Sequence, residues 1–568
     1  MSIEIELDHA KACIWARVAW NDKEGVEIVK ALSGREWDKQ EGCWRIPVAP
    51  QTVHEVATFV RSLGYADDDL FEIVAKLRAQ HRSSYERSFL QQADRVIRVP
   101  GLVKTLRPYQ EAGVAYALDR NGTLLGDDMG LGKTLQAIAT VEHEKLFPCL
   151  VMAPAVAVWN WVKEIRESTG KQAGVPDGGK KAPVDGADYI VVSASSLHKV
   201  PTDRRFAAVI FDESQYFKGD ESLRTRQAKH ILEYDQPDLR LALSGTPYST
   251  GRPIELVPQL ELLGALDRFG GRWPFIERYC APKKTHFGMD LNGASNVAEL
   301  GVKLREVCMI RRLRKDVLGE LPPLQTSFVP ARMTNAAEYK RADKEFLAWY
   351  KDKLKFRPDL VAFPDEDPSK WSEKYLMARI LLKLEKMGES IEELGFGQLR
   401  WLTGKGKIAA AQAWIDDFLI SAKDKPLVVF AHSIDVQKAI AARYQDRLDF
   451  TAIYGSTLPP ARAKIVEDFQ AGRKSLLLAS LQAANSAITL TRAAHMLFAE
   501  IDHIPSTMDQ AFARTHRMGQ ENPVNVYLLF AEEGLDPVLQ GMQDTRRKLF
   551  QTTFDGTFQA ANVQQELV

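Results

Sequence analysis

The sequence has few cysteines and no apolar run long enough to span a membrane. Its 568 residues include five scattered cysteines, with no Cys-x-x-Cys pair among them: Cys13, Cys43, Cys149, Cys280 and Cys308. This spacing argues against a zinc site and a disulfide framework, and it favours a reducing compartment. Residues 1–6 are acidic and alternate in polarity, unlike a signal peptide. We therefore expect an intracellular protein, in cytoplasm, nucleoid or nucleus, that is not secreted and does not enter a membrane.

The chain also lacks an excess of charge of either sign. Its 75 basic and 75 acidic residues give a formal net charge of zero, so any surface that binds nucleic acid must be a local basic stripe. Low-complexity tracts and short-period repeats are absent. With 45% apolar and 26% charged residues, the composition is that of a soluble globular protein. The length indicates about three or four domains.

A glycine-rich turn at residues 126–134 is the clearest candidate for a chemical site. An apolar step leads into it and a helical apolar pattern follows, so backbone N–H groups and the positive end of a helix dipole would converge on an anion. Lys133 would reach the β- and γ-phosphates of a nucleotide, and the Thr134 hydroxyl would bind Mg²⁺. Asp127 stands where the strict form of this motif has its first glycine. A glycine-rich helix entry without a ligand is therefore the alternative.

Continuous apolar runs recur after this turn, at residues 149–153, 189–192, 207–211 and 239–243. Each is followed by turn-like or helical sequence, which is typical of a parallel sheet covered on both faces. An acidic pair, Asp212 and Glu213, follows the third run, at the edge where a nucleotide-binding sheet needs it. Asp212 would join the Mg²⁺ shell, and Glu213 would orient and deprotonate the attacking water. An ordinary acidic turn is the alternative.

A second series of apolar strands begins after residue 405, at residues 427–431, 450–454, 475–480, 495–499 and 524–530. Between its last two members, Arg514 and Arg517 stand three residues apart, on one face of a predicted helix. They could point together at a γ-phosphate from across a cleft, where such an arginine is worth about 10³–10⁵ in rate. The alternative is an ordinary basic helix.

The N-terminal residues have a different pattern. Strands are predicted at 3–7 and 13–20, helices at 24–32 and 52–63, and a hairpin at 35–47. This small α+β module is rich in tryptophan beside basic residues, and Trp37, Trp44 and Arg45 could stack bases and hold phosphates. The alternative is a small core that uses tryptophan.

Three further segments have weaker patterns. Residues 311–318 are arginine-rich, and they predict either a solvated basic helix face or a phosphate contact. Residues 358–370 are expected to form an exposed loop. The helical pattern of residues 375–394 predicts an inserted protrusion.

Taken in order, the motifs resemble those of superfamily 2 helicases, in the SNF2 branch. The segments similar to the Q motif and to motifs I, II, III, V and VI are Gln110, Gly130-x-Gly132-Lys133-Thr134, Asp212-Glu213-Ser214, Ser244-Gly245-Thr246-Pro247, residues 480–491 and residues 510–520. Pro154 with Trp161 is similar to motif Ia. Gln215 stands where this branch ordinarily has histidine, which puts coupling between motifs II and III in doubt more than hydrolysis.

Two features narrow the resemblance to the annealing-helicase group. Residues 34–47 resemble its HARP domain, through Gly34-Arg35-x-Trp37-Asp38 and Cys43-Trp44-Arg45-Ile46-Pro47. Ala483-Ala484-Asn485 and Phe498-Ala499-Glu500 resemble the same group.

The resemblance implies an α/β fold with two RecA-like parallel-sheet lobes, SNF2-type helical insertions and a small N-terminal α+β domain. The expected divisions are 1–65 (HARP-like module), 66–100 (helical connector), 101–250 (lobe 1), 251–403 (helical protrusions and linker), 404–550 (lobe 2) and 551–568 (tail).

The resemblance also implies an activity. A monomeric motor would hydrolyse ATP with Mg²⁺ between the lobes and translocate on double-stranded DNA, with fork remodelling or strand annealing on branched DNA as a more specific role. A strand-separating DNA or RNA helicase and an ATP-gated DNA clamp with little turnover are the alternatives.

The resemblance assigns roles to individual residues. The expected nucleotide-binding residues are Arg107, Gln110, Asp128, Gly130, Leu131, Gly132, Lys133 and Thr134. The expected catalytic residues are Lys133, Asp212, Glu213, Gln510, Arg514 and Arg517, with Thr134 and Asp212 on the metal. The expected DNA contacts are Pro154, Trp161, Ser193, Thr246 and Ser480 in the lobes, and Trp37, Trp44 and Arg45 in the N-terminal module.

Overall fold

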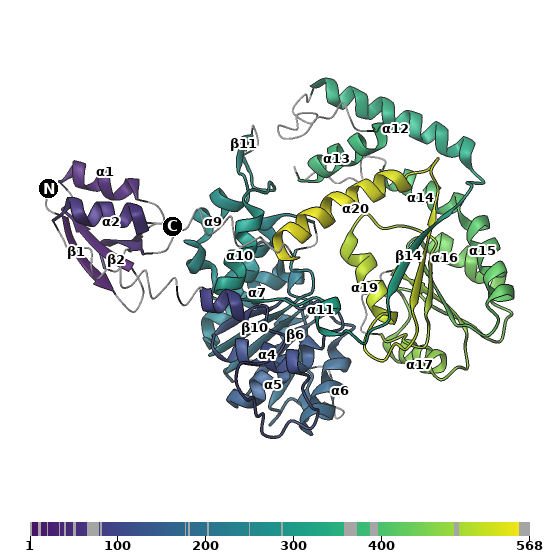
Figure 1. The fold of residues 1–568 in the computed structure, drawn as a ribbon, viewed down its shortest axis with the longest axis horizontal. Coiled ribbons are helices and arrows are strands. Elements are labelled where there is room, and N and C mark those ends of the chain that lie inside the picture. Colours follow the sequence, from purple (N-terminus) through teal and green to yellow (C-terminus); the bar gives the residue numbers. More distant parts are fainter. Residues whose placement is uncertain are drawn as a thin grey trace.

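Three bodies follow one another along the computed structural model, with a small N-terminal module beside the first of two larger α/β lobes (Figure 1). The structure describes residues 3–8, 13–19, 21–32, 35–38, 41–48, 53–64, 79, 82–176, 178–179, 182–201, 204–248, 250–285, 288–356, 372–386, 396–481 and 488–555. Within these ranges, no helix is both long and apolar enough to cross a membrane. The predicted loop 358–370 and most of residues 482–491 lie outside the described residues.

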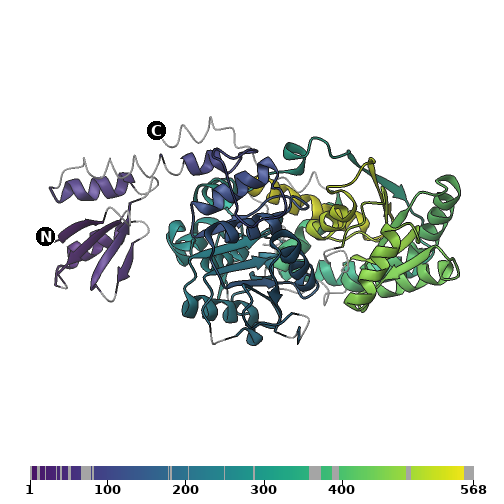
Figure 2. The same cartoon turned by 90° about the horizontal axis from the view of Figure 1, so that it is seen from below.

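The N-terminal module is an antiparallel sheet with two helices on one face. The strands, in the order β1-β2-β4-β3, are Ile3–Asp8, Cys13–Val18, Cys43–Pro47 and Glu36–Asp38, and the helices are α1 (Lys23–Ala31) and α2 (Val53–Ser62). Alternate residues of each strand face the helices, so Ile3, Ile14 and Ile46 join one buried core. Figures 1 and 2 both place the module beyond lobe 1, on the side away from lobe 2.

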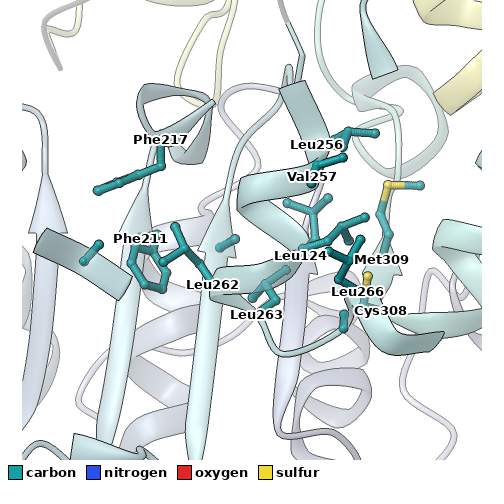
Figure 3. Packing of buried hydrophobic residues seen from close by; sticks show 14 of the residues in the cluster. Leu124, Phe211, Phe217, Leu256, Val257, Leu262, Leu263, Leu266, Cys308 and Met309 are labelled. Atoms are coloured by element: carbon teal, nitrogen blue, oxygen red, sulfur yellow. The ribbon is translucent and has the colours of Figure 1, made fainter. Parts of the chain in front are cut away.

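Lobe 1 is built on a seven-stranded parallel sheet. Its strands, in spatial order, are β13 (Met309–Ile310), β5 (Gly122–Leu125), β10 (Leu239–Leu243), β9 (Ala208–Asp212), β6 (Cys149–Ala153), β8 (Tyr189–Ser193) and β7 (Ala173–Gly174). Successive residues of one strand enter opposite cores: Leu124 packs in one cluster and Leu125 in the other. Figure 3 shows part of the first cluster, where Leu124 lies near Leu256 and Phe211 lies near Leu262. Continuous apolar runs are therefore required, because both faces are buried.

The helices of lobe 1 divide between the two faces of this sheet. Helices α5 (Lys133–Glu144) and α6 (Val158–Thr169) pack on one face, and α8 (Val257–Leu262) and α10 (Val297–Val307) pack on the other. Helix α4 (Pro108–Leu118) precedes β5 and packs against α5. Part of the predicted connector belongs to this lobe too, because the Ser84 hydroxyl donates a 3.2 Å hydrogen bond to the Arg305 carbonyl on α10.

Lobe 2 repeats the arrangement with six parallel strands. In spatial order they are β14 (Leu324–Pro330), β19 (Val524–Phe530), β18 (His495–Phe498), β15 (Leu427–Ala431), β17 (Leu476–Ser480) and β16 (Phe450–Ile453). The helices of this lobe include α15 (Ile408–Ser421), α16 (Ile434–Tyr444), α17 (Pro459–Gln470) and α19 (Pro505–Thr515). The fold class predicted from the sequence, two parallel-sheet lobes of α/β type, is confirmed.

Both sheets extend beyond the boundaries expected from the sequence. Strand β13 pairs with β5 at the edge of lobe 1, and β14 pairs with β19 at the edge of lobe 2, although both lie within the expected insertion 251–403. The apolar pattern did not indicate them because β13 has two residues and β14 is largely exposed. The link between the lobes is therefore short, and it runs from residue 311 to residue 323.

Helix α20 (Asp536–Phe550) joins the two lobes a second time. Its first half packs against α13 (Glu373–Lys386), and the following turn, Gln551–Asp555, packs against α10 of lobe 1. There the ring of Phe554 lies 4.8 Å from that of Tyr248. Residues 551–555 are thus part of the lobe 1 surface rather than a separate tail.

Candidate nucleotide site between the lobes

The glycine-rich turn joins β5 to α5 and depends on two left-handed glycines. Gly130 and Gly132 have φ angles of +84° and +71°. A Cβ atom on Gly132 would lie 2.4 Å from Nε2 of Gln110, so a larger residue would displace the Gln110 amide and strain the left-handed backbone. Helix α5 starts at Lys133, and the unpaired N–H groups of its first turn border the turn as a phosphate site requires.

Lys133 folds back onto its own loop. Its Nζ donates to the carbonyl oxygens of Asp127 at 2.7 Å and Asp128 at 3.2 Å. Burial lowers the pKa of the amine, and the charges of Glu213, Asp127 and Asp128 work in the opposite direction. The predicted phosphate ligand is therefore already inside the loop, and its charge is held by backbone carbonyls.

Gln110 braces the same loop from α4. Its Oε1 accepts from the Arg107 backbone N–H at 2.9 Å, and its Nε2 donates to the Leu131 carbonyl at 3.2 Å. The Arg107 side chain forms a 2.5 Å ion pair with Glu320 in the inter-lobe link. In this structure Gln110 holds the glycine-rich turn of residues 126–134, called the phosphate loop below. A contact of Gln110 with adenine stays a prediction.

The acidic pair lies at the carboxyl end of β9. Asp212 accepts a 2.8 Å hydrogen bond from Nε1 of Trp161, and burial together with the charge of Glu213 raises the pKa of Asp212 to about 7. Two neighbouring half-buried carboxylates that face Lys133 suit a divalent cation, which would offset their mutual repulsion. Thr134 lies in the first turn of α5, and its predicted role as the hydroxyl ligand of such a site stays a prediction.

Trp161 differs from the DNA contact expected of it. It is 2% exposed, packs in the core beneath α6 with Val158 and Ile165, and uses its indole N–H to orient Asp212. The helical period of α6 carries this signal, because residues 158, 161 and 165 share one face. Trp159, which the sequence interpretation passed over, points outward and is 46% exposed.

Gln215 connects motif II to motif III by hydrogen bonds, although its presence in place of histidine had put coupling between these motifs in doubt. Its Nε2 donates to Oε2 of Glu213 at 2.7 Å, and its Oε1 accepts from the Ser244 hydroxyl at 2.7 Å. The Ser244 oxygen in turn accepts from the Thr246 backbone N–H at 3.0 Å. A continuous chain of hydrogen bonds therefore links the candidate base to the segment after β10, through an amide that carries no titratable proton.

The two arginines of lobe 2 face lobe 1. Burial and the charge of Arg517 lower the pKa of Arg514 to about 10, and the charge of Glu213 works in the opposite direction. A Cβ atom on Gly130 would lie 3.4 Å from Cβ of Arg517, so Arg517 adjoins the phosphate loop. Arg517 also donates to the Thr489 hydroxyl at 3.1 Å. The interface thus brings together the loop, the acids and the arginines, while Gln510 lies buried on α19.

The other expected DNA contacts in the lobes follow the carboxyl ends of parallel strands. Pro154 follows β6, Ser193 ends β8, Thr246 follows β10 and Ser480 ends β17. Pro154, Thr246 and Ser480 are buried, and the Ser193 hydroxyl lies 2.7 Å from that of Ser195. Contact with DNA stays a prediction for these positions.

In the N-terminal module the predicted DNA-contacting residues divide between two faces. Trp37 is 49% exposed and meets Trp44 edge to face, at 5.2 Å between ring centroids. Arg45 lies on the opposite face and forms a 3.2 Å ion pair with Glu36. The cross-strand pairing places these acidic and basic residues on that face: Glu4, Glu6, Asp8, Arg17, Glu36, Asp38 and Arg45. Of the three residues, Trp37 offers the most accessible stacking surface.

Comparison with family models gives two domains in the order that the sequence motifs predict. Residues 73–175 match the model of the SNF2-related domain, and residues 410–519 match that of the helicase conserved C-terminal domain. The Sulfolobus solfataricus SWI2/SNF2 ATPase core in complex with dsDNA aligns over 81% of this chain and 99% of its own, with 21% identity and a TM-score of 0.38.

Curated relatives match most of this chain. The human DNA annealing helicase and endonuclease ZRANB3 is 30% identical over 472 residues, which cover 79% of this chain and 40% of the relative. The Drosophila melanogaster SWI/SNF-related matrix-associated actin-dependent regulator of chromatin subfamily A-like protein 1 is 32% identical over 470 residues, 79% of this chain and 56% of the relative. The chain thus spans about half the length of these relatives. It carries an SNF2-related domain ahead of a helicase conserved C-terminal domain, and in this it is similar to the SNF2-type relatives above.

Proposed function

We propose that this chain is a DNA-dependent ATPase that translocates on double-stranded DNA, as a motor of SNF2 type. The observation that carries the proposal is the placement of Arg514 and Arg517 from lobe 2 against the phosphate loop and Glu213 of lobe 1. Because one chain supplies both halves of the site, a monomer suffices for hydrolysis.

Each half of the site has a distinct task. Lys133 leaves the two carbonyls that hold it and binds the β- and γ-phosphates, while Glu213, held by Gln215, accepts a proton from the attacking water. Thr134 and Asp212 would hold Mg²⁺, which supplies charge neutralisation at the phosphates. Arg514 and Arg517 stabilise the charge that develops on the transferred group.

Hydrolysis changes the relation between the lobes. A triphosphate contacted by both lobes favours their closed arrangement, and its cleavage removes that difference in affinity. DNA lies across the carboxyl edges of the two sheets and is held through its phosphates, so binding is independent of sequence and weakens with salt. The relatives named as DNA annealing helicases support a role in strand annealing, with the N-terminal module as the element that directs it.

The test is ATP hydrolysis by the full chain with duplex, forked and single-stranded DNA and with RNA. We expect duplex or forked DNA to stimulate turnover most, and Lys133→Ala to abolish it without loss of DNA binding. Stronger stimulation by single strands or RNA would favour a strand-separating helicase instead. ATP-dependent DNA binding without turnover would favour the clamp, and either result would overturn the proposal.

A further inference from the structure

The arginine-rich segment after β13 is neither a solvated basic face nor a free phosphate contact. Arg311 and Arg312 are 4% and 3% exposed, and Arg314 is half-buried in α11 (Arg314–Val317), at the start of the link between the lobes. All three guanidinium groups contact residues of the phosphate loop. The segment therefore belongs to the nucleotide site, although residues 311–314 stand about 180 positions after it.

The first two arginines fix the loop to the sheet. Arg311 donates through Nη1 to the Gly126 carbonyl at 2.6 Å, and Arg312 donates through Nε to Oδ1 of Asp127 at 2.8 Å. Nη2 of Arg312 also donates to Oε1 of Gln136 on α5 at 3.0 Å. These contacts lie inside lobe 1, and they leave the base of the loop little room to move.

Arg314 differs because its contacts span the two lobes. Its Nε donates to Oδ2 of Asp128 at 3.2 Å, and its Nη1 donates to the backbone carbonyl of His516 at 2.7 Å. His516 stands between Arg514 and Arg517 in sequence. Its Nε2 lies 2.7 Å from the carbonyl oxygen of Pro322, so the end of α19 is held to the inter-lobe link at two points.

Asp128 connects Arg314 to Lys133 in the candidate nucleotide site. Its carbonyl accepts from Lys133, and its carboxylate accepts from Arg314. Burial works against the charged carboxylate, but the charges of Arg314 and Arg311 outweigh it and lower the pKa of Asp128. A change at the Lys133 amine therefore acts directly on the backbone of the residue that Arg314 holds.

We propose that Arg314 is a positioning residue that couples the phosphate loop to the two arginines of lobe 2. One edge of its guanidinium binds Asp128 and another part binds His516, so the conformation of the loop sets where Arg514 and Arg517 lie. An ammonium group lacks the planar fork that serves two fixed acceptors, so lysine does not replace it. The inference rests on the proposed function, since it assumes that Arg514 and Arg517 act on the transferred phosphate.

The test compares Arg314→Ala and Arg314→Lys with Lys315→Ala, a change of the next, exposed cation on the same short helix. Both Arg314 variants are expected to lower the kcat of DNA-stimulated hydrolysis by about tenfold or more, as the loss of a charge-assisted contact implies. The Kd for a non-hydrolysable ATP analogue should stay within about threefold, because direct phosphate ligands are untouched. Lys315→Ala should match the unchanged protein in both measurements.

A second measurement separates positioning from a merely structural role. In an Arg514→Ala/Arg517→Ala background, Arg314→Ala should lower kcat no further, since the groups it positions are gone. Independent, multiplying losses, or an Arg314→Ala protein as active as Lys315→Ala, would overturn the inference while leaving the proposed function intact. Unchanged turnover in Arg514→Ala/Arg517→Ala itself would overturn the proposed function. If Arg314→Ala unfolds, Arg314→Lys carries the same comparison, with the thermal unfolding midpoint as the check on folding.

Discussion

Each lobe has two carboxylates at or just after the end of a central strand of its parallel sheet, but the surroundings of the two pairs differ. The lobe 1 pair repels itself, whereas hydrogen-bond donors satisfy the lobe 2 pair. In lobe 1, Asp212 ends β9 and Glu213 follows, and burial beside Glu213 raises the pKa of Asp212 to about 7. In lobe 2, Glu500 and Asp502 follow β18, and donors of their own lobe satisfy them. Glu500 accepts from the backbone N–H groups of residues 432 and 433, at 2.8 and 2.7 Å.

Asp502 shows the contrast most clearly. It accepts from Arg400 at 3.0 Å and from the Ile504 backbone N–H at 2.8 Å. Although burial opposes it, the His503 ring, whose Nδ1 lies 3.3 Å from Oδ1, and the charge of Arg400 hold the pKa of Asp502 well below its usual range. Position in the fold thus makes an acidic pair possible, and the surrounding donors decide its use. Acids whose mutual repulsion dominates their surroundings can bind a cation from solution, whereas acids paired with a buried arginine hold their lobe together.

The largest effect expected from this comparison is on turnover. Glu213→Gln keeps the hydrogen bond to Gln215 but removes the base, so we expect kcat of DNA-stimulated ATP hydrolysis to fall by about 10²–10⁴. Glu500→Gln, at the corresponding place in lobe 2, should lower turnover only as far as it lowers the folded fraction. The exposed Glu221→Gln serves as control. Equal losses in Glu213→Gln and Glu500→Gln would contradict the division of roles.

The next effect is on the free energy of unfolding, and it is expected in lobe 2 rather than in lobe 1. Asp502→Asn leaves Arg400 buried with a weakened partner, so lobe 2 should lose about 3–5 kcal/mol of unfolding free energy. Asp212→Asn removes a carboxylate whose charge is disfavoured, and it should cost lobe 1 nothing in Mg²⁺-free buffer. Hydrogen exchange of β18 and β9 reports the two lobes separately.

The matched control for this stability comparison is Asp416→Asn, which breaks an exposed ion pair with Arg443 on the surface of lobe 2. It should leave the protection of β18 unchanged, because exposed pairs contribute little. A loss in Asp212→Asn as large as that in Asp502→Asn would show that both acids are structural.

A smaller effect is expected at Gln215, which links Glu213 to Ser244. Gln215→Ala removes both hydrogen bonds between Glu213 and Ser244, and we expect about a tenfold loss of kcat. Gln215→His should restore turnover above about pH 6.5, where a neutral ring can donate to one partner and accept from the other. Below that pH the protonated ring loses its acceptor, and turnover should fall. Exposed Gln445→Ala is the control.

The sequence predicts the strands and the motifs well, since both are local. The runs at 149–153, 239–243 and 427–431 coincide with β6, β10 and β15 because strands buried on both faces must be continuously apolar. The helical spacing of residues 158, 161 and 165 indicates that Trp161 faces the core, whereas the resemblance to motif Ia assigns it a DNA contact. Contacts of residues 311–314 were not accessible, because Asp127 stands 185 positions from Arg312 and no local pattern joins them.

A further effect is expected in the pH dependence of the two lobes in Mg²⁺-free buffer. An unfolded aspartate titrates near pH 3.9, so a folded pKa of about 7 at Asp212 favours folding below about pH 4 and loses that contribution as the pH rises through 7. The depressed pKa of Asp502 has the opposite sign: its contribution is present above about pH 4 and is lost only as the pH falls through the folded value. Protection of β9 should therefore decline between about pH 4 and 7 while that of β18 stays level, and Asp212→Asn should remove the decline. Parallel slopes in the two strands would mean that the two acidic pairs sit in equivalent surroundings, which their different hydrogen-bond partners argue against.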